Sequence, residues 1–333
     1  MAENDEETGV FKKSIAVCLT AAVVGGAAPA SAQEGGRAPV RIVVASAPGG
    51  NVDVLGRILA EHLSALTHQN YYVENRAGAG GNIGTAYVAK AKPDGQTLLI
   101  VSTSHTSNVH LYRNVGYDPI KSFAPISSLA GSAFAIAVPV GSKYKTLKDL
   151  VADARAHPGA LNYGSAGVGQ GNHLGMELLK SDIGIDLMHV PFTSMGAVVT
   201  ALMGAQVDVA MLTLPGALAG AEAGKVRILG VTGRQRVPKL ATVLTIREAI
   251  GHEFDLTAWQ GLLGPAGMSD KQVAELNQNV RKVMADPRVV EQLDRIALTP
   301  DVSTPDEFGR FLSAETARWG KVIIDAKIGV EKQ

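Results

Sequence analysis

The chain has 333 residues, and its 31 lysines and arginines balance its 31 aspartates and glutamates. Because it has no basic excess and no block of lysines and arginines, the composition argues against nucleic-acid binding. After the first 32 residues no apolar run is long enough for a membrane-spanning helix, and the length allows two domains.

The N-terminal 32 residues have the composition of a signal peptide. Lys12 and Lys13 precede the apolar run 14–28, and a small-residue triplet follows it. A charged segment, a short apolar segment and a small-residue cleavage site are the three parts of a secretory signal. We predict cleavage after Ala32, export to the periplasm and a linker over residues 33–39. A buried helix or a membrane anchor is the alternative.

From residue 40 onward, segments with strand and helix patterns alternate. The first are a strand at 40–46, a helix at 52–66, a strand at 71–74, a helix at 83–91 and a strand at 97–102. The strands are apolar and β-branched, and the helices have apolar residues at i, i+3 and i+4. This order predicts a largely parallel sheet with helices on both faces.

The rest of the chain continues the alternation. We predict strands at 134–138, 161–163, 187–190, 207–211, 226–231 and 257–263, and helices at 147–157, 173–181, 197–203, 270–284, 287–296 and 304–326. Thr146, Ser269 and Thr304 directly precede helical patterns. Their hydroxyls predict N-caps, since serine and threonine accept hydrogen bonds from the first free N–H groups of a helix.

Two glycine-rich loops, each between a predicted strand and a predicted helix, are the strongest functional signal. The first is residues 47–51 (APGGN) and the second is residues 164–169 (GSAGVG). Small residues let a ligand approach the backbone, and a helix start offers free N–H groups and a partial positive charge. The pair predicts an anion held from both sides of a cleft, with ordinary tight turns as the alternative.

Five segments spread along the chain carry the residue patterns of a known family. They are VENRAGAGGNIG (73–84) with AKAKPDG (89–95), NVHLY (108–112) with YDP (117–119), LNYGSAG (161–167) with HL (173–174), GAQVD (204–208), and WQGLLGPAG (259–267) with WGKV (319–322). In combination they resemble the periplasmic solute-binding proteins of tripartite tricarboxylate transporters, the Bug-type receptors. The match spans residues 40–328.

The resemblance implies an α/β fold of the two-lobed periplasmic-binding-protein type. This is a type II-like Venus flytrap in which each lobe is a mainly parallel sheet flanked by helices. Residues 40–132 and 257–333 would form a discontinuous domain 1, and residues 133–256 would form domain 2. The chain would cross between them near 131–135 and 255–259.

The resemblance also implies a function without catalysis. The lobes would close over a small organic carboxylate and deliver it to membrane permease subunits. No cofactor, metal or nucleic acid is expected, and the mature chain would be a monomer that is not embedded in the membrane.

The candidate ligand-binding residues come from both glycine-rich loops and their surroundings. By the resemblance, Ala47, Pro48, Gly49, Gly50 and Asn51 contact the ligand through backbone groups and ordered water, and Ser165, Ala166 and Gly167 hold a carboxylate. Ser102 and Thr103 follow a strand at the edge of the sheet where ligands of open α/β folds bind.

Four neighbouring features have competing interpretations. His173 either donates to a carboxylate or packs in its helix. Asp53 is expected to cap its helix rather than contact an anion. Residues 78–82 are expected to form a structural turn, because they lack the lysine and hydroxyl ending of a phosphate loop. Asp208 either binds a ligand ammonium, a water or a neighbouring N–H.

The side-chain wall of the predicted pocket is less polar than is usual in the family. Phe192 and Thr193 stand where tyrosine and lysine are common, and Leu212 and Thr213 where aspartate and asparagine are common. An amino-acid ligand needs an acceptor for its ammonium group. These residues therefore favour an apolar or aromatic carboxylate.

Signatures of enzymes are missing from the sequence. There is no H-E-x-x-H and no cysteine–histidine cluster, and the only cysteine, Cys18, lies in the predicted signal peptide. Residues 164–167 are a broken form of the G-x-S-x-G nucleophile motif. An enzyme on the same fold would have only His173 and Asp208 as catalytic candidates. The alternative function is a receptor that passes its signal to a two-component sensor, because such a receptor uses the same cleft.

Overall fold

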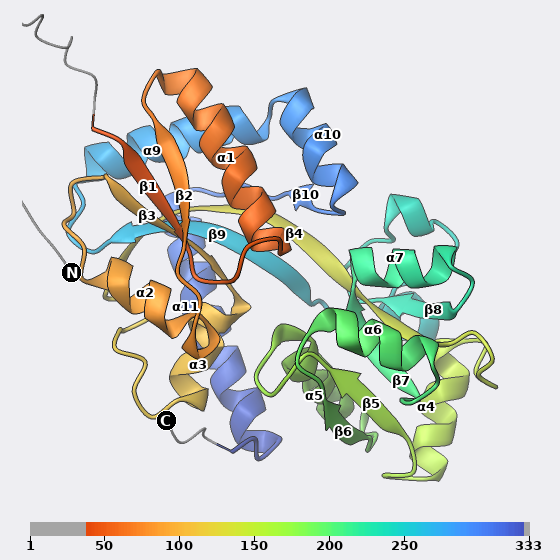
Figure 1. Cartoon of the computed structure of the whole chain (residues 1–333). Coiled ribbons are helices and arrows are strands. Elements are labelled where there is room, and N and C mark those ends of the chain that lie inside the picture. The colour runs from red at the N-terminus through yellow and green to blue at the C-terminus, as the bar shows by residue number, and fades with distance from the viewer. Residues whose placement is uncertain (1–37, 330–333) are drawn as a thin grey trace, which may run out of the picture. The chain divides into compact units, whose positions relative to one another are not determined.

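The computed structural model describes residues 38–329, so the predicted signal peptide and most of the predicted linker lie outside the described residues. Helices and strands alternate along this unit (Figure 1). The strands are β1 (Val40–Val44), β2 (Tyr71–Asn75), β3 (Thr97–Ser102), β4 (Phe123–Pro139), β5 (Asn162–Ser165), β6 (Met188–Pro191), β7 (Val209–Thr213), β8 (Val226–Val231), β9 (Thr257–Pro265) and β10 (Thr299–Pro300).

The helices connect these strands and cover their faces. They are α1 (Asn51–Thr67), α2 (Asn82–Ala89), α3 (Thr103–Leu111), α4 (Leu147–Ala156), α5 (Gly171–Ile183), α6 (Met195–Met203), α7 (Leu214–Glu222), α8 (Ile246–Ile250), α9 (Asp270–Met284), α10 (Pro287–Arg295) and α11 (Pro305–Asp325), with 3-10 turns η1 (Ala79–Gly81) and η2 (Pro238–Leu240). No helix among the described residues is long and apolar enough to cross a membrane.

Strand β4 belongs to two sheets and thereby joins two lobes. In the first sheet the order is β2-β1-β3-β9-β4, and β10 also pairs with β4. In the second sheet the order is β4-β7-β5-β6, and β8 also pairs with β4. Residues 123–133 of β4 pair with β9, whereas residues 134–139 pair with β7 and β8. The two-lobed α/β fold is confirmed.

Both sheets are mixed rather than mainly parallel. The expected parallel pairing is present where β1 joins β2 and β3, and where β5 joins β6 and β7. The pairs that involve β4 or β9 are antiparallel. In the first lobe β9 runs against β1, β2 and β3, whereas β4 runs in the same direction as these strands; in the second lobe β4 runs against β5, β6 and β7.

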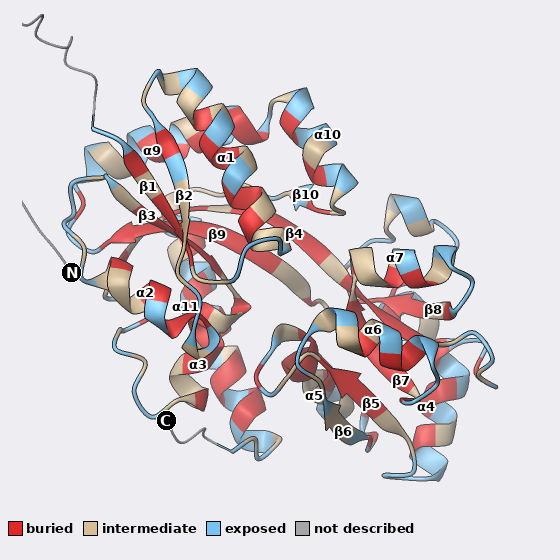
Figure 2. Ribbon diagram, viewed as in Figure 1, coloured by how far each residue is buried: buried red, intermediate tan, exposed pale blue. Residues whose placement is uncertain are grey.

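In the first lobe, successive strand residues point to opposite faces of the sheet. Ile42, Val44 and Ile100 pack on one face with residues of α1, α9 and α10. Val43 and Leu99 pack on the other face with residues of α2 and α11. Both faces are covered, so most residues of β1 and β3 are buried (Figure 2). This explains why they appear in the sequence as continuous apolar runs.

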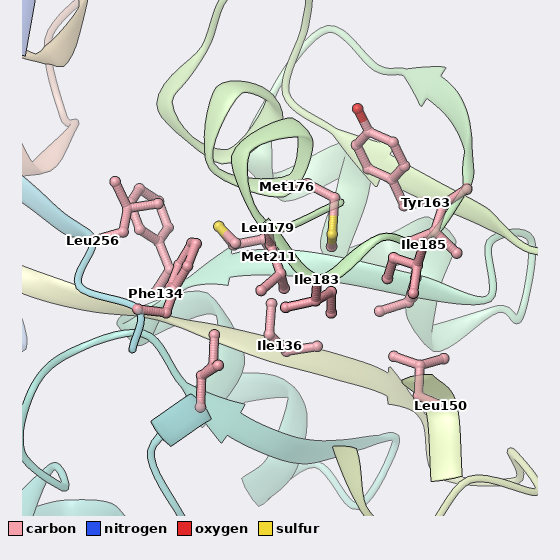
Figure 3. Packing of buried hydrophobic residues seen from close by; sticks show 14 of the residues in the cluster. Phe134, Ile136, Leu150, Tyr163, Met176, Leu179, Ile183, Ile185, Met211 and Leu256 are labelled. Carbon is pink, nitrogen blue, oxygen red and sulfur yellow. The ribbon is translucent and has the colours of Figure 1, made fainter. Parts of the chain in front are cut away.

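The second lobe follows the same rule. Ile136 and Met211 join Tyr163 and residues of α4 and α5 in one hydrophobic cluster (Figure 3). Ala135 and Leu212 face the other way, toward α6 and α7. The first cluster also contains Leu111 of α3 and Trp319, Val322 and Ile323 of α11. The two lobes therefore share part of their apolar core.

A buried threonine ties the two chain crossings together. The Thr232 hydroxyl accepts a hydrogen bond from Phe134 N (2.9 Å) and donates to Leu256 O (2.6 Å). Its backbone N–H donates to Phe134 O (3.0 Å), and its carbonyl accepts from Leu256 N (3.1 Å). Thr232 has no exposed surface. One residue thus fixes both crossing segments where they pass between the lobes.

A buried glutamate attaches the last helix to the crossing strand β9. Glu315 Oε2 accepts hydrogen bonds from the indole N–H groups of Trp259 (3.1 Å) and Trp319 (2.9 Å). Arg318 donates to Glu315 Oε1 (3.3 Å) and to Asp255 O (2.9 Å). These bonds fix α11 against the segment that enters the first lobe.

Most of the predicted elements are present, and the three predicted N-caps are confirmed. Thr146, Ser269 and Thr304 each form a capping box with the third helical residue. The predicted strand 134–138 is only the second part of β4, and α3, α7, α8 and β10 were not expected. The first part of β4 lacks a strand pattern because it contains Pro125, Ser127, Ser128 and Gly131.

We expect Glu315→Ala to lower the free energy of unfolding by about 3 kcal/mol, because two buried indole N–H groups would lose their acceptor. Urea unfolding followed by tryptophan fluorescence measures the change. Glu291→Ala is the matched control: its exposed ion pair with Arg295 (2.7 Å) contributes less than about 1 kcal/mol. Equal losses in the two variants would contradict this role of Glu315.

Candidate functional site

A cavity of about 420 Å³ lies at the carboxyl ends of β1, β2 and β3. This is the edge at which open α/β sheets bind ligands. Fifteen of its sixteen lining residues come from the segment 45–105, and the last is Gln170, which directly precedes α5. The volume falls within the range of small-molecule sites, about 300–1,000 Å³.

The first glycine-rich loop contributes to this cavity only through its last residues. Gly50 and Asn51 line it, whereas Ala47, Pro48 and Gly49 are exposed and do not. Gly50 is the N-cap of α1 and makes no side-chain capping bond, so the first N–H groups of α1 are the polar groups that this loop offers. Two of the five residues predicted from this loop therefore line the cavity.

Asp53 holds this loop in place. Its carboxylate accepts hydrogen bonds from Gly49 N (2.9 Å), Asn75 Nδ2 (2.8 Å) and Arg57 (3.0 and 3.1 Å). Burial opposes ionisation, but the bonds from Arg57, Gly49 and Asn75 outweigh it and lower the pKa of Asp53. Asp53 therefore fixes the loop that precedes α1 and accepts no hydrogen bond from the first-turn N–H groups of the helix, so the expected capping role is not seen; its carboxylate is fully engaged by its own lobe.

Strand β3 and helix α3 supply the next part of the wall. Ser102 lines the cavity together with Ser104 and His105. Thr103 is buried, and its hydroxyl lies 3.8 Å from the point where a Cβ on Gly171 would stand. Thr103 therefore faces the start of α5 rather than the cavity.

His105 is a residue that the sequence did not single out. It is buried, and its Nε2 lies 2.8 Å from Pro119 O, to which it donates. Burial lowers the pKa of His105 to about 4 despite this bond, so the ring is neutral at pH 7. Its Nδ1 is buried without a partner among the described residues. The cavity wall therefore contains a neutral imidazole with a free acceptor.

Residues 78–81 line the cavity as well as forming the expected turn. Gly78, Gly80 and Gly81 have φ angles of 129°, 64° and 99°, a region that favours glycine. A Cβ on Gly80 would stand 2.7 Å from the Tyr112 hydroxyl. All three glycines face the cavity. The expected structural turn is present, and its three glycines also line the cavity.

The second glycine-rich loop is organised by a histidine. The Ser165 hydroxyl has no exposed surface and lies 2.6 Å from His189 Nε2, and it also accepts from Gly167 N (3.2 Å). Ala166 N donates to Asn172 Oδ1 (3.4 Å). Ser165, Ala166 and Gly167 do not line the cavity. The Ser165 hydroxyl thus orders the loop itself.

His173 supports the same loop from helix α5. Its Nδ1 accepts a hydrogen bond from Gly169 N (3.0 Å), and its ring stacks on His189 with centroids 4.0 Å apart. Burial, together with the charges of His189 and Lys180, lowers the pKa of His173 to about 3. Of the two roles expected for His173, the packing role is the one that the structure shows.

The predicted pocket wall in the second lobe lies away from the cavity. Phe192 packs with the cluster beneath the second sheet, and Thr193 is exposed. Thr213 ends β7 and is the N-cap of α7. Asp208 lies at the opposite end of β7, where it accepts from Asn162 N (2.9 Å) and its own N–H donates to Asn162 Oδ1 (3.2 Å). Of the three partners considered for Asp208, it binds a neighbouring N–H.

The sixteen lining residues include no lysine, arginine, aspartate or glutamate. The N-termini of α1 and α3 reach the cavity, and neither helix has a side-chain cap. Helix starts offer N–H donors and partial positive charge. No group of histidines, cysteines and acids within residues 38–329 could hold a metal ion. The site has the chemistry of anion binding by neutral donors.

Comparisons with known proteins agree with this geometry. A sequence profile described as "Tripartite tricarboxylate transporter family receptor" matches residues 55–328. A protein of Pseudomonas sp. (strain P51), named "UPF0065 protein in tcbD-tcbE intergenic region", is 34% identical over 295 residues, which cover 88% of each chain.

Two solved structures of Rhodopseudomonas palustris proteins are similar over most of their length. Rpa4515 with adipate has a TM-score of 0.78 and 32% identity, and the match covers 89% of this chain and 99% of that one. MatC with bound malate has a TM-score of 0.73 and 28% identity, with 86% and 99% coverage.

We expect Asp53→Asn to cost about 1–2 kcal/mol of unfolding free energy at neutral pH, because a charged acceptor of three partners is lost. Since the folded-state pKa of Asp53 is lowered, the difference is present above about pH 4 and disappears as the pH falls through the folded value. Urea unfolding across this range measures it. Asp306→Asn, at the exposed start of α11, is the control and would change stability by less than about 1 kcal/mol. A loss of similar size in both variants would contradict the role of Asp53.

The two buried neutral histidines make stability fall in acid. In the unfolded chain, His105 and His173 take up a proton below about pH 6.5. In the folded chain the pKa is about 4 for His105 and about 3 for His173, so both rings stay neutral to a lower pH. Each of these histidines therefore lowers the free energy of unfolding by about 2 kcal/mol when the pH falls from about 7.5 to about 5.0. In urea unfolding at both pH values, we expect His173→Gln to lose less free energy of unfolding between about pH 7.5 and about pH 5.0 than the wild type does. His68 is exposed, so His68→Asn should show the same change of unfolding free energy with pH as the wild type. The same change in His173→Gln would contradict the role of His173 as a buried neutral histidine.

Proposed function

Since the chain belongs to the tripartite tricarboxylate transporter receptor family, we propose that it captures a small organic carboxylate between its two lobes and delivers it to the membrane subunits of such a transporter. The observation that carries this proposal is the cavity at the carboxyl ends of β1–β3, where backbone glycines and two helix starts converge without a charged side chain. Neutral N–H donors of this kind suit a carboxylate.

The proposed ligand is an aliphatic carboxylate. Phe192, one of the residues that favoured an apolar or aromatic ligand, is half-buried against the core of the second lobe and does not line the cavity. The apolar lining consists of small and aliphatic residues such as Ala45, Val52 and Ile100. The relatives crystallised with adipate and malate carry ligands of this class.

The proposed division into domains follows the two sheets. Residues 40–132 and 257–333 would move as domain 1, and residues 133–256 as domain 2. The change of β4 from β9 to β7 and β8 after residue 133, and the hydrogen bonds of Thr232 to both crossings, support this division. Closure of the lobes would bury the ligand and create the surface that the permease recognises.

The remaining parts of the proposal concern the protein's place in the cell. We propose export to the periplasm with cleavage after Ala32, and action there as a monomer that carries out no chemical step. The membership in a receptor family supports this. A role in signalling through the same cleft would appear as loss of gene induction with uptake intact in a deletion strain.

Isothermal titration with succinate, malate, glutarate, adipate, pimelate and benzoate tests the proposal. We expect saturable binding of at least one aliphatic member and a concentration-dependent rise of the melting temperature, because a ligand that binds only the folded state stabilises it. Hexane-1,6-diol, which has no carboxylate, is the control and should not bind. Binding of the diol, of benzoate alone or of none of the acids would contradict the proposal.

A further inference from the structure

Gln170 is the only residue of the second lobe among the sixteen that line the cavity. It is the N-cap of α5 and is exposed at the end of the second glycine-rich loop. Gln170 thus belongs to one lobe and lines the cavity of the other. Gln170 is therefore placed where it could contact a ligand that is bound by the first lobe.

The backbone on both sides of Gln170 lies close to the first lobe. A Cβ on Gly169 would stand 2.3 Å from Leu111 Cδ1, and one on Gly171 would stand 3.8 Å from the Thr103 hydroxyl. Gly169 also has a φ of 79°, and its N–H is fixed by His173. The two glycines thus allow the close approach that places Gln170 at the cavity.

The carboxamide of Gln170 is not used elsewhere in the described part of the chain. Its side chain makes no capping bond to α5, although its backbone is held by bonds between Gln170 N and Gly167 O (3.3 Å) and between Leu174 N and Gln170 O (3.0 Å). A carboxamide has two N–H donors and one carbonyl acceptor. The backbone is fixed while these donors are free to meet a ligand.

We propose that Gln170 is a specificity-determining residue whose side-chain N–H donates a hydrogen bond to the carboxylate held in the first lobe. This inference rests on the proposed function and names the residue through which the second lobe contacts the carboxylate of the ligand. Because the cavity has no charged side chain of its own, one charge introduced at Gln170 would dominate its selectivity.

Three variants test this inference on the member of the acid panel that the wild type binds most tightly. Gln170→Met keeps the length of the side chain and removes the donors, so we expect affinity to fall about threefold to tenfold. Gln170→Glu places a negative charge beside the carboxylate, so we expect a loss of more than about tenfold at about pH 7.5. Gln206→Glu adds the same charge at an exposed position away from the cavity and should leave affinity unchanged.

The pH dependence separates a ligand contact from a general loss of structure. Protonation of the glutamate in Gln170→Glu removes its charge, so its affinity relative to wild type should recover in part as the pH falls to about 5, whereas that of Gln170→Met should stay constant. Equal affinities of Gln170→Glu and Gln206→Glu, or tighter binding by Gln170→Glu, would overturn the inference. If the wild type binds none of the acids, the proposed function itself fails, which is a different result.

Discussion

The structure depends on one strand that serves two sheets. Residues 123–133 of β4 pair with β9, and residues 134–139 pair with β7 and β8, so both lobes are built on the same backbone. Thr232 bonds to Phe134 on this strand and to Leu256 on the returning segment. Buried hydrogen bonds thus hold the two crossing segments together, and the proposed movement of the lobes would take place about these two crossings.

This constraint explains how a cavity built almost wholly by the first lobe can respond to the second. The crossings keep α3 beside the start of α5, where Gly169 and Gly171 allow backbone and side chains to touch. In the proposed arrangement the second lobe would act on the ligand through Gln170, while its own glycine-rich loop is held by His189 and His173.

The fold could be predicted from the sequence because apolar periodicity and helix caps are local signals. Strands β1 and β3 appear as β-branched runs, and the Ser269 and Thr304 caps mark helix starts. Helix α3 could not be predicted, since Thr103, Thr106 and Asn108 are poor helix formers that the surrounding elements bury. The predicted site residues that line the cavity, such as Gly50 and Ser102, lie at strand ends and glycines, which are local signals. Gln170 and His105 were missed because their position depends on contacts between distant segments.

A cavity without charged side chains suits a receptor that must also release its ligand. A buried lysine or arginine opposite a carboxylate would hold it by a strong charge pair, and removal of the ligand would leave that charge unpaired in a dry site. Helix starts and backbone N–H groups stabilise an anion through many weaker contacts that water can take over one at a time when the lobes part. Asp53 supports this arrangement, because its carboxylate fixes the loop together with Arg57 and Asn75. These hydrogen bonds satisfy the negative charge of Asp53 inside the first lobe. Selectivity then depends on where neutral donors are placed, and the position with most freedom to vary is the exposed side chain that enters from the other lobe.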